Sequence, residues 1–140
     1  MRVSSVRWGW AVSGALAAEV VMVAAAFAWV AIYSYLLHPG ESAGFYQQYA
    51  MRASPWVSLV AGAPIFYLVC SWIGSRSPAH AFPTAIGLFA LYFLIDAPLV
   101  MFGDNPFISL WFVAINYSVK FLACYLGGRS GARNEIPQPA

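Results

Sequence analysis

Charged side chains are scarce in this 140-residue sequence, where Asp, Glu, Lys and Arg together make up 9%. An ordinary soluble domain carries about 25%. Hydrophobic residues make up 61% of the chain, against roughly 45–50% in a soluble domain. A soluble globule of this length has a high surface-to-volume ratio and needs more polar side chains to cover itself. The composition therefore excludes a soluble domain and indicates that the chain is embedded in a lipid bilayer.

Positive charge is too sparse to bind nucleic acid. The formal net charge is +2, and the Lys and Arg residues are scattered along the chain. Neutralising a phosphate backbone requires basic residues gathered in a stripe or patch. We therefore expect no nucleic-acid partner.

The residue types that carry enzyme and metal chemistry are also few. The chain has two cysteines and two histidines, and it contains no CxxC pair, no Gly-rich phosphate loop and no nucleophile elbow. Cys70 and Cys124 are expected to pack as small hydrophobic side chains. We therefore predict no catalytic motif, no metal site and no cofactor.

Long apolar runs are abundant, and each of the four is close to or above the roughly 20 residues that cross a bilayer. They cover residues 10–37, 56–74, 83–103 and 107–126. Glu19 interrupts the first run, which continues to residue 37, so we interpret it as a span and not as a cleaved signal peptide. We predict an all-α fold, an integral membrane bundle of four transmembrane helices. Residues 1–127 form this domain, and residues 128–140 form a polar cytoplasmic tail.

Cap residues and breakers predict the helix boundaries. Ser54 and Pro55 predict the start of the second helix, as its N-cap and first helical residue. Residues 104–106 (Asp-Asn-Pro) predict a short turn that caps the fourth helix, so that helices three and four form an antiparallel hairpin. Gly127 and Gly128 predict the end of the fourth helix.

Residues 38–53 are the longest connection between the predicted helices, and we expect them on the outer face. Phe45, Tyr49 and Arg52 recur at helical spacing, which predicts a short amphipathic helix among the lipid headgroups. His38, Glu41 and Arg52 are the polar candidates for recognition on this face. His38 and Glu41 alone are too few ligands for a metal site.

Basic residues predict the orientation. An even number of spans places both termini on one side of the membrane. That side holds five arginines against Arg52 alone on the other: Arg2, Arg7, Arg76, Arg129 and Arg133. Because cytoplasmic loops carry the excess of Lys and Arg, we predict a multi-pass protein of the plasma (inner) membrane with both termini in the cytoplasm.

Small residues at four-residue intervals indicate where helices approach one another in lipid. Three such rows occur: Gly14 with Ala18, Gly9 with Ser13 and Ala17, and Ser54 with Ser58 and Gly62. They predict seams between the helices.

Three ionisable side chains fall inside the apolar runs: Glu19, Asp96 and Lys120. A charge at the bilayer centre costs about 2.5–3.5 kcal/mol, so such residues face the bundle interior and pair. At about 1.5 Å per residue, Glu19 and Lys120 are closest in depth, which predicts an ion pair. Asn116 lies one turn from Lys120, between it and Asp96 in depth. The four residues form a ladder of polar groups that is typical of a proton or ion relay.

Three functions fit this pattern. The first is proton- or ion-coupled transport, in which Glu19 and Asp96 exchange protons or cations and Lys120 with Asn116 controls their charge. The second is a non-catalytic accessory subunit or scaffold of a membrane complex, in which the buried charges fix helix pairing. The third is a membrane enzyme that acts on lipid or quinone from the outer loop. A transport path through four short helices would require assembly with copies of the chain or with other subunits.

Overall fold

The computed structural model describes residues 5–103 and 105–133. All regular structure in this part of the chain is helical, which confirms the predicted all-α class. The elements are α1 (Trp8–Ile32), the π-helical turn η1 (Tyr33–Leu37), α2 (Ala43–Arg76), the 3₁₀ turn η2 (Pro78–His80), α3 (Ala81–Phe102) and α4 (Leu110–Arg133). Four helices are long and apolar enough to cross a membrane, as predicted.

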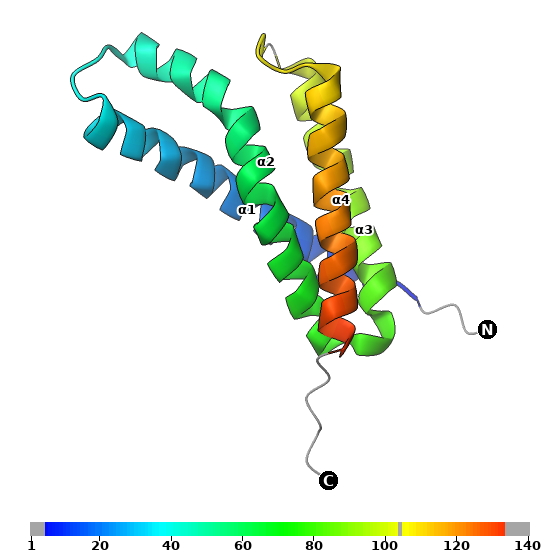
Figure 1. The fold of residues 1–140 in the computed structure, drawn as a ribbon. Helices are drawn as coiled ribbons and strands as arrows, with labels where there is room; N and C mark the ends of the chain where they lie inside the picture. Colours follow the sequence, from blue (N-terminus) through cyan, green and yellow to red (C-terminus); the bar gives the residue numbers. More distant parts are fainter. Residues whose placement is uncertain (1–4, 104, 134–140) are drawn as a thin grey trace.

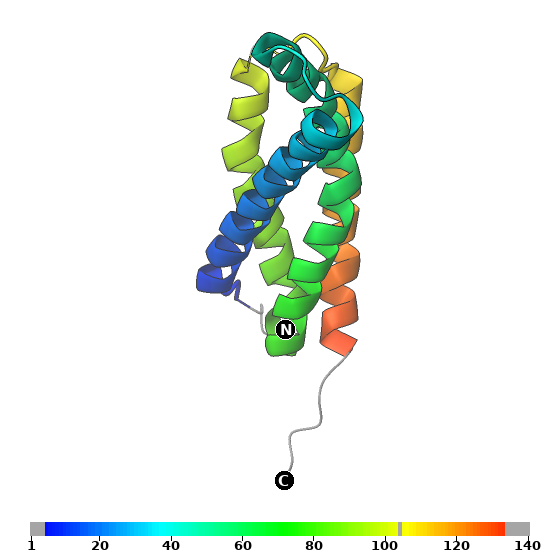
Figure 2. The ribbon, with the colours of Figure 1, turned by 90° about the vertical axis from the view of Figure 1, so that its left-hand side faces the viewer.

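The helices pack as two antiparallel hairpins, α1 with α2 and α3 with α4 (Figure 1). The hairpins contact each other because α2 packs along α4 and α1 packs against α3. Figure 2 shows α1 crossing the other helices obliquely. The start of α1 and the end of α4 therefore lie at the same end of the molecule, beside the link from α2 to α3.

The two ends of the molecule differ. At one end, here called the closed end, the backbone N–H of Arg7 donates to Thr84 Oγ1 at 3.2 Å, and its guanidinium donates to Ser77 Oγ. At the other, called the divergent end, the hairpins separate (Figure 1), and Asn105 Nδ2 donates to the Met51 carbonyl at 2.9 Å. Hydrogen bonds therefore join the two hairpins at both ends of the molecule, although the helices of one hairpin diverge from those of the other toward the divergent end.

The tightly packed core lies in the closed half. It holds the fully buried side chains of Phe66, Cys70, Ile73, Leu88 and Cys124. The Gly14 row belongs to this core, because Gly14 and Ala18 are buried. The row Gly9, Ser13 and Ala17 is exposed, so its prediction as a seam is wrong. The two rows lie about 100° apart around α1 and only one of them faces the neighbouring helices.

The predicted start of the second helix at Ser54 and Pro55 is wrong. The helix begins twelve residues earlier in the chain, after Ser42, whose hydroxyl accepts from the backbone N–H of Phe45 at 3.3 Å. Pro55 lies inside α2 and cannot donate to the carbonyl of Met51, four residues before it. The side chains of Asn105 and Ser54 donate to that carbonyl instead, at 2.9 Å and 3.3 Å. A partner from a distant segment therefore lets the helix continue through the proline.

The expected separate amphipathic helix is the first part of α2. Its aromatic residues pack against the end of the first helix and do not form an isolated interfacial segment. Tyr49 stacks on Tyr33 with ring centroids 3.5 Å apart, and the Tyr46 hydroxyl donates to the His38 carbonyl. The link between the first two helices is therefore only residues 38–42.

The fourth helix also differs from its prediction at both ends. It begins at Leu110, not at residue 107, and continues past Gly127 and Gly128 to Arg133. Asp104, expected in the preceding turn, lies outside the described residues, and Asn105 Oδ1 accepts from the backbone N–H of Phe107 at 3.0 Å. A Cβ atom on Gly127 would overlap the backbone carbonyl of Tyr67 on α2. The glycines are therefore contact points between α4 and α2, and this packing overrides their low helix propensity.

Candidate functional site

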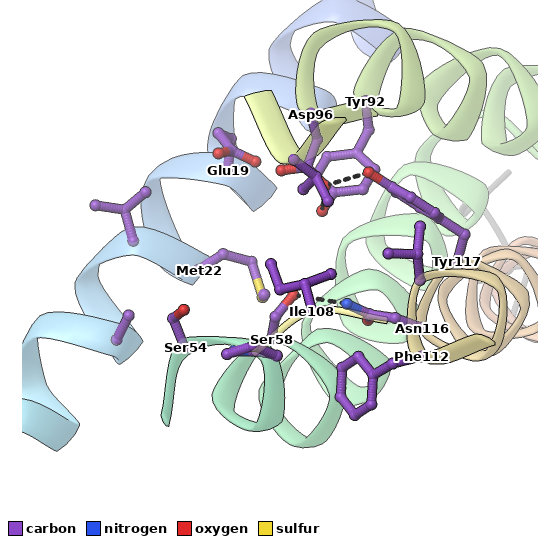
Figure 3. A pocket seen from close by; sticks show the side chains of 15 residues that line it. Glu19, Met22, Ser54, Ser58, Tyr92, Asp96, Ile108, Phe112, Asn116 and Tyr117 are labelled. Carbon is purple, nitrogen blue, oxygen red and sulfur yellow. Dashed lines mark hydrogen bonds between the residues drawn. The ribbon is translucent and has the colours of Figure 1, made fainter. Parts of the chain in front are cut away.

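A cavity of about 220 Å³, lined by both apolar and polar side chains, lies between the hairpins on the side of the divergent end (Figure 3). All four long helices contribute side chains to its wall. The polar members of the wall are Glu19, Ser54, Ser58, Tyr92, Asp96, Asn116 and Tyr117. Three residues of the predicted ladder, Glu19, Asp96 and Asn116, therefore meet in one cavity.

Lys120 of α4 lies directly beside this cavity and is fully buried. Its Nζ donates to Ser58 Oγ at 2.8 Å and to Tyr92 Oη at 2.7 Å. The ammonium also lies 4.9 Å from the centroid of the Tyr92 ring and 5.9 Å from that of Phe66. Hydroxyl acceptors and aromatic faces stabilise a cation that has left water.

Gly62 makes room for this lysine. A Cβ atom at Gly62 would lie 2.6 Å from Lys120 Cε, so the aliphatic stem passes over the glycine. Ser58 and Gly62 belong to the row predicted as a helix seam. In the structure the row accommodates the buried lysine as well as the neighbouring helix.

Asp96 accepts two hydrogen bonds from tyrosines. Tyr92 Oη donates to Asp96 Oδ2 at 2.8 Å, and Tyr117 Oη donates to the same oxygen at 2.7 Å. Since Lys120 donates to Tyr92, the ammonium is joined to the carboxylate through one phenol hydroxyl. The arrangement is a continuous hydrogen-bonded chain from Lys120 through Tyr92 to Asp96 (the lysine–tyrosine–aspartate chain).

The predicted pairing of Lys120 with Glu19 is not what the structure shows. The hydrogen bonds that Lys120 makes to other described residues go to hydroxyls, not to a carboxylate. Depth along the helices suggested Glu19, but the lysine stem lies along α2 and points its end toward α3. The direction in which the Lys120 side chain leaves the helix axis decides its hydrogen-bond partners, and depth in the membrane does not give this direction.

Glu19 lies on the opposite wall of the cavity, on α1. Its side chain is partly exposed and lies within electrostatic range of both Asp96 and Lys120. Figure 3 shows the Glu19 carboxylate directed toward Asp96. Two carboxylates from different helices therefore border the same space.

Asn116 is joined to the same network. Its Nδ2 donates to Ser58 Oγ at 3.1 Å, so Ser58 accepts from both Asn116 and Lys120. Its Oδ1 is buried and has no hydrogen-bond partner among the described residues. Buried polar atoms are almost always paired, so this oxygen is a free acceptor at the wall of the cavity.

Sequence reasoning missed the two tyrosines. Tyr92 lies four residues before Asp96, which is about one helical turn, and this spacing indicates that the two side chains can contact each other. Tyr117 lies on another helix, 21 residues after Asp96, and no local pattern joins them. Only the packing of α4 against α3 reveals that contact.

The outer-loop candidates do not form a common site with the cavity. His38, Glu41 and Arg52 are all exposed. The His38 ring lies 4.9 Å from that of Tyr33, and the Arg52 guanidinium lies 5.6 Å from the centroid of Phe107. Among the described residues, no group of three or more His, Cys, Asp or Glu side chains is arranged to hold a metal ion.

The hydrogen bond between Lys120 and Tyr92 can be tested by a double-mutant cycle. Lys120→Met and Tyr92→Phe each remove one partner, and each is expected to reduce the free energy of unfolding by about 1–3 kcal/mol. Because both remove the same bond, the double variant is expected to lose less than the sum, with a coupling of about 0.5–3 kcal/mol. The measurement is denaturant unfolding in detergent.

Tyr67→Phe is the matched control for that cycle, because the Tyr67 hydroxyl donates to Ser130 at 3.1 Å and not to the lysine. Its effect is expected to add to that of Lys120→Met. Additive behaviour of Tyr92→Phe with Lys120→Met would contradict the direct bond.

Comparisons with known proteins add no assignment to this geometry. No family model, no curated protein and no solved structure matches this chain. The proposed function therefore rests on the cavity and the residues that line it.

Proposed function

We propose that this chain is a small proton- or ion-coupled transport protein, in which Glu19 and Asp96 bind the proton or cation. One observation carries the proposal. The two carboxylates come from different helices and line one cavity, while the nearby ammonium of Lys120 reaches Asp96 only through the hydroxyl of Tyr92.

The charges of the site support exchange of a single positive charge. With both carboxylates ionised and Lys120 charged, Glu19, Asp96 and Lys120 together carry one net negative charge. In a medium of low dielectric constant such an excess charge is costly. Binding of one proton or one monovalent cation removes it, so the two compete for the same site, which is the basis of coupled transport.

The lysine–tyrosine–aspartate chain supports a role for Asp96 in proton exchange. Lys120 polarises the Tyr92 hydroxyl, which together with Tyr117 donates to one oxygen of the carboxylate. The other oxygen, Oδ1, has no such donor among the described residues and is available to a proton or cation. Asn116 and Ser58 hold the lysine end of the network.

Access to the cavity supports transport that alternates between the two sides. The cavity lies toward the divergent end, and the buried side chains of Phe66, Tyr92 and Lys120 fill the space between it and the closed end. Passage to the closed end requires a rearrangement of one hairpin against the other. Assembly of several copies or with partner subunits would provide a wider path.

The distribution of arginines supports an orientation for this transport. Arg7, Arg76, Arg129 and Arg133 lie at the closed end, and Arg52 lies toward the divergent end. The positive-inside rule then places the closed end and both termini in the cytoplasm and the cavity toward the outside of the plasma membrane. The helices form the bundle of a multi-pass protein in this orientation.

The burial of Lys120 favours a second candidate, a non-catalytic accessory subunit. Lys120 is fully buried, makes hydrogen bonds to α2 and α3 and lies against Gly62. A network of this kind can serve only to fix which helices are neighbours. In that case neutral substitutions of the cavity carboxylates change stability and leave ion movement at the background level of empty vesicles.

Reconstitution into liposomes that contain a pH-sensitive dye tests the proposal. An imposed cation gradient is expected to drive proton movement in the wild-type protein and in Glu41→Gln, because Glu41 is exposed and outside the cavity. Glu19→Gln is expected to reduce the rate by about a hundredfold, the scale of losing one proton-transfer group. Equal rates for the two variants would refute a role for the cavity carboxylate.

A further inference from the structure

A second hollow, of about 360 Å³, lies at the closed end and is separate from the central cavity. It is bounded by η2 and the start of α3 on one side and by the last two turns of α4 on the other. Its lining includes Ala79, Phe82, Tyr125, Arg129 and Arg133. The charged side chains of this lining are the two arginines, and among residues 5–103 and 105–133 no acidic side chain contributes to it.

Close contact between α3 and α4 places these arginines beside the start of α3. A Cβ atom on Gly128 would lie 2.9 Å from Ala85 Cβ, so the helices approach through a glycine. Arg129 follows this contact, and Arg133 comes one helical turn later on the same face of α4. Both arginines are exposed, so their guanidinium groups are free to reach a ligand at the rim.

The positive charge of the hollow comes from its two arginines. The 3₁₀ turn η2 leads directly into α3, and the backbone N–H of Ala81 donates to the Pro78 carbonyl. Pro83, in the first turn of α3, has no N–H. The start of α3 therefore supplies the wall of the hollow, and Arg129 and Arg133 supply its charge.

Aromatic side chains form the part of the wall nearer the membrane interior. The rings of Phe82 and Tyr125 meet edge to face with centroids 5.6 Å apart. Phe82 is 47% exposed, and Tyr125 is partly buried. Aromatic residues gather at the level of lipid headgroups. The hollow thus presents positive charge at its rim and apolar surface below it.

We propose that this hollow binds the phosphate group of an anionic phospholipid, with the acyl chains lying along Phe82 and Tyr125. Guanidinium groups bind phosphate through paired, charge-assisted hydrogen bonds. Basic pockets between transmembrane helices are suited to lipid headgroups, because one molecule satisfies both the charge and the apolar surface. The inference uses none of the residues of the transport site and does not depend on it.

Titration of the purified full-length protein in detergent tests this site. The probes are short-chain phosphatidylglycerol, which is anionic, and short-chain phosphatidylcholine, which is zwitterionic. The wild-type protein is expected to bind phosphatidylglycerol more tightly. Each of the variants Arg129→Gln and Arg133→Gln is expected to weaken that binding about fivefold, and the double variant about 30-fold, with little change for phosphatidylcholine.

Arg76→Gln is the matched control. Arg76 is also an exposed arginine of the closed end, but it lies over Trp72, with its guanidinium 5.0 Å from the ring centroid, and does not line the hollow. It is expected to bind phosphatidylglycerol as the wild type does. An equal loss in Arg76→Gln would mean that general surface charge attracts the lipid, and would overturn the site.

A competition experiment with inorganic phosphate distinguishes a phospholipid from free phosphate, the two ligands that carry a phosphate group. At millimolar concentration it is expected to leave the bound phosphatidylglycerol in place, because it lacks the acyl chains. Displacement of the lipid by phosphate alone would identify a site for free phosphate and overturn the lipid assignment. Unfolding temperatures of the single variants close to that of the wild type show that binding, and not folding, has changed.

Discussion

Replacement of Gly131 by leucine is expected to destabilise the protein by about 3 kcal/mol or more, the upper end of the range for overpacked sites. A Cβ atom at Gly131 would overlap the backbone carbonyl of Ser71 and lie 2.9 Å from the Cα of Gly74. Both obstacles are backbone atoms of α2, which cannot rotate away as a side chain can. The leucine therefore forces apart α2 and α4, the most extensive helix contact in the molecule.

Gly9→Leu is the matched control, because nothing lies within 4 Å of a Cβ atom at Gly9. Gly9 is exposed near the start of α1, and the same substitution there adds a side chain that faces the surroundings. The measurement is thermal unfolding in detergent, followed by tryptophan fluorescence. If Gly131→Leu unfolds at the same temperature as Gly9→Leu, the close approach of α2 and α4 is wrong.

The variant Asp96→Asn is expected to abolish proton-coupled flux in liposomes while the protein stays folded. The asparagine carbonyl can still accept from Tyr92 and Tyr117, so the hydrogen bonds that hold α3 and α4 remain. The charge changes, however: Glu19 and Lys120 then balance, and the site has no excess negative charge for a proton or cation to neutralise. We expect a loss of about a hundredfold or more.

A second substitution tests the same charge argument in the opposite direction. Adding Lys120→Met to Asp96→Asn leaves Glu19 as the single charge of the site and restores one net negative charge. Part of the flux is therefore expected to return, although each substitution alone reduces it. A double variant that is folded at the temperature of the assay but is as inactive as Asp96→Asn would show that net charge does not govern the site.

The candidate site could be predicted in part. Glu19, Asp96 and Lys120 are conspicuous in the sequence because a charge in an apolar run is costly unless it faces protein. Their identity and approximate depth follow from this rule and from the rise of a helix. Which of them bond to one another does not, since the rotation of each helix about its axis depends on its neighbours. Tyr92 and Ser58, the actual partners of Lys120, are ordinary residues of apolar helices until the packing is seen.

The amino-acid sequence by itself determined the helical class and the number of helices able to span a membrane. Both depend on the transfer of side chains into lipid and on the satisfaction of backbone groups within a helix, which are local properties. The tertiary structure decided where α2 begins and where α4 ends. A distant Asn105 occupies the carbonyl that Pro55 leaves free, and Gly127 and Gly131 contact the backbone of α2. Proline and glycine end helices when nothing compensates for them, and here the compensation comes from segments far away in the chain.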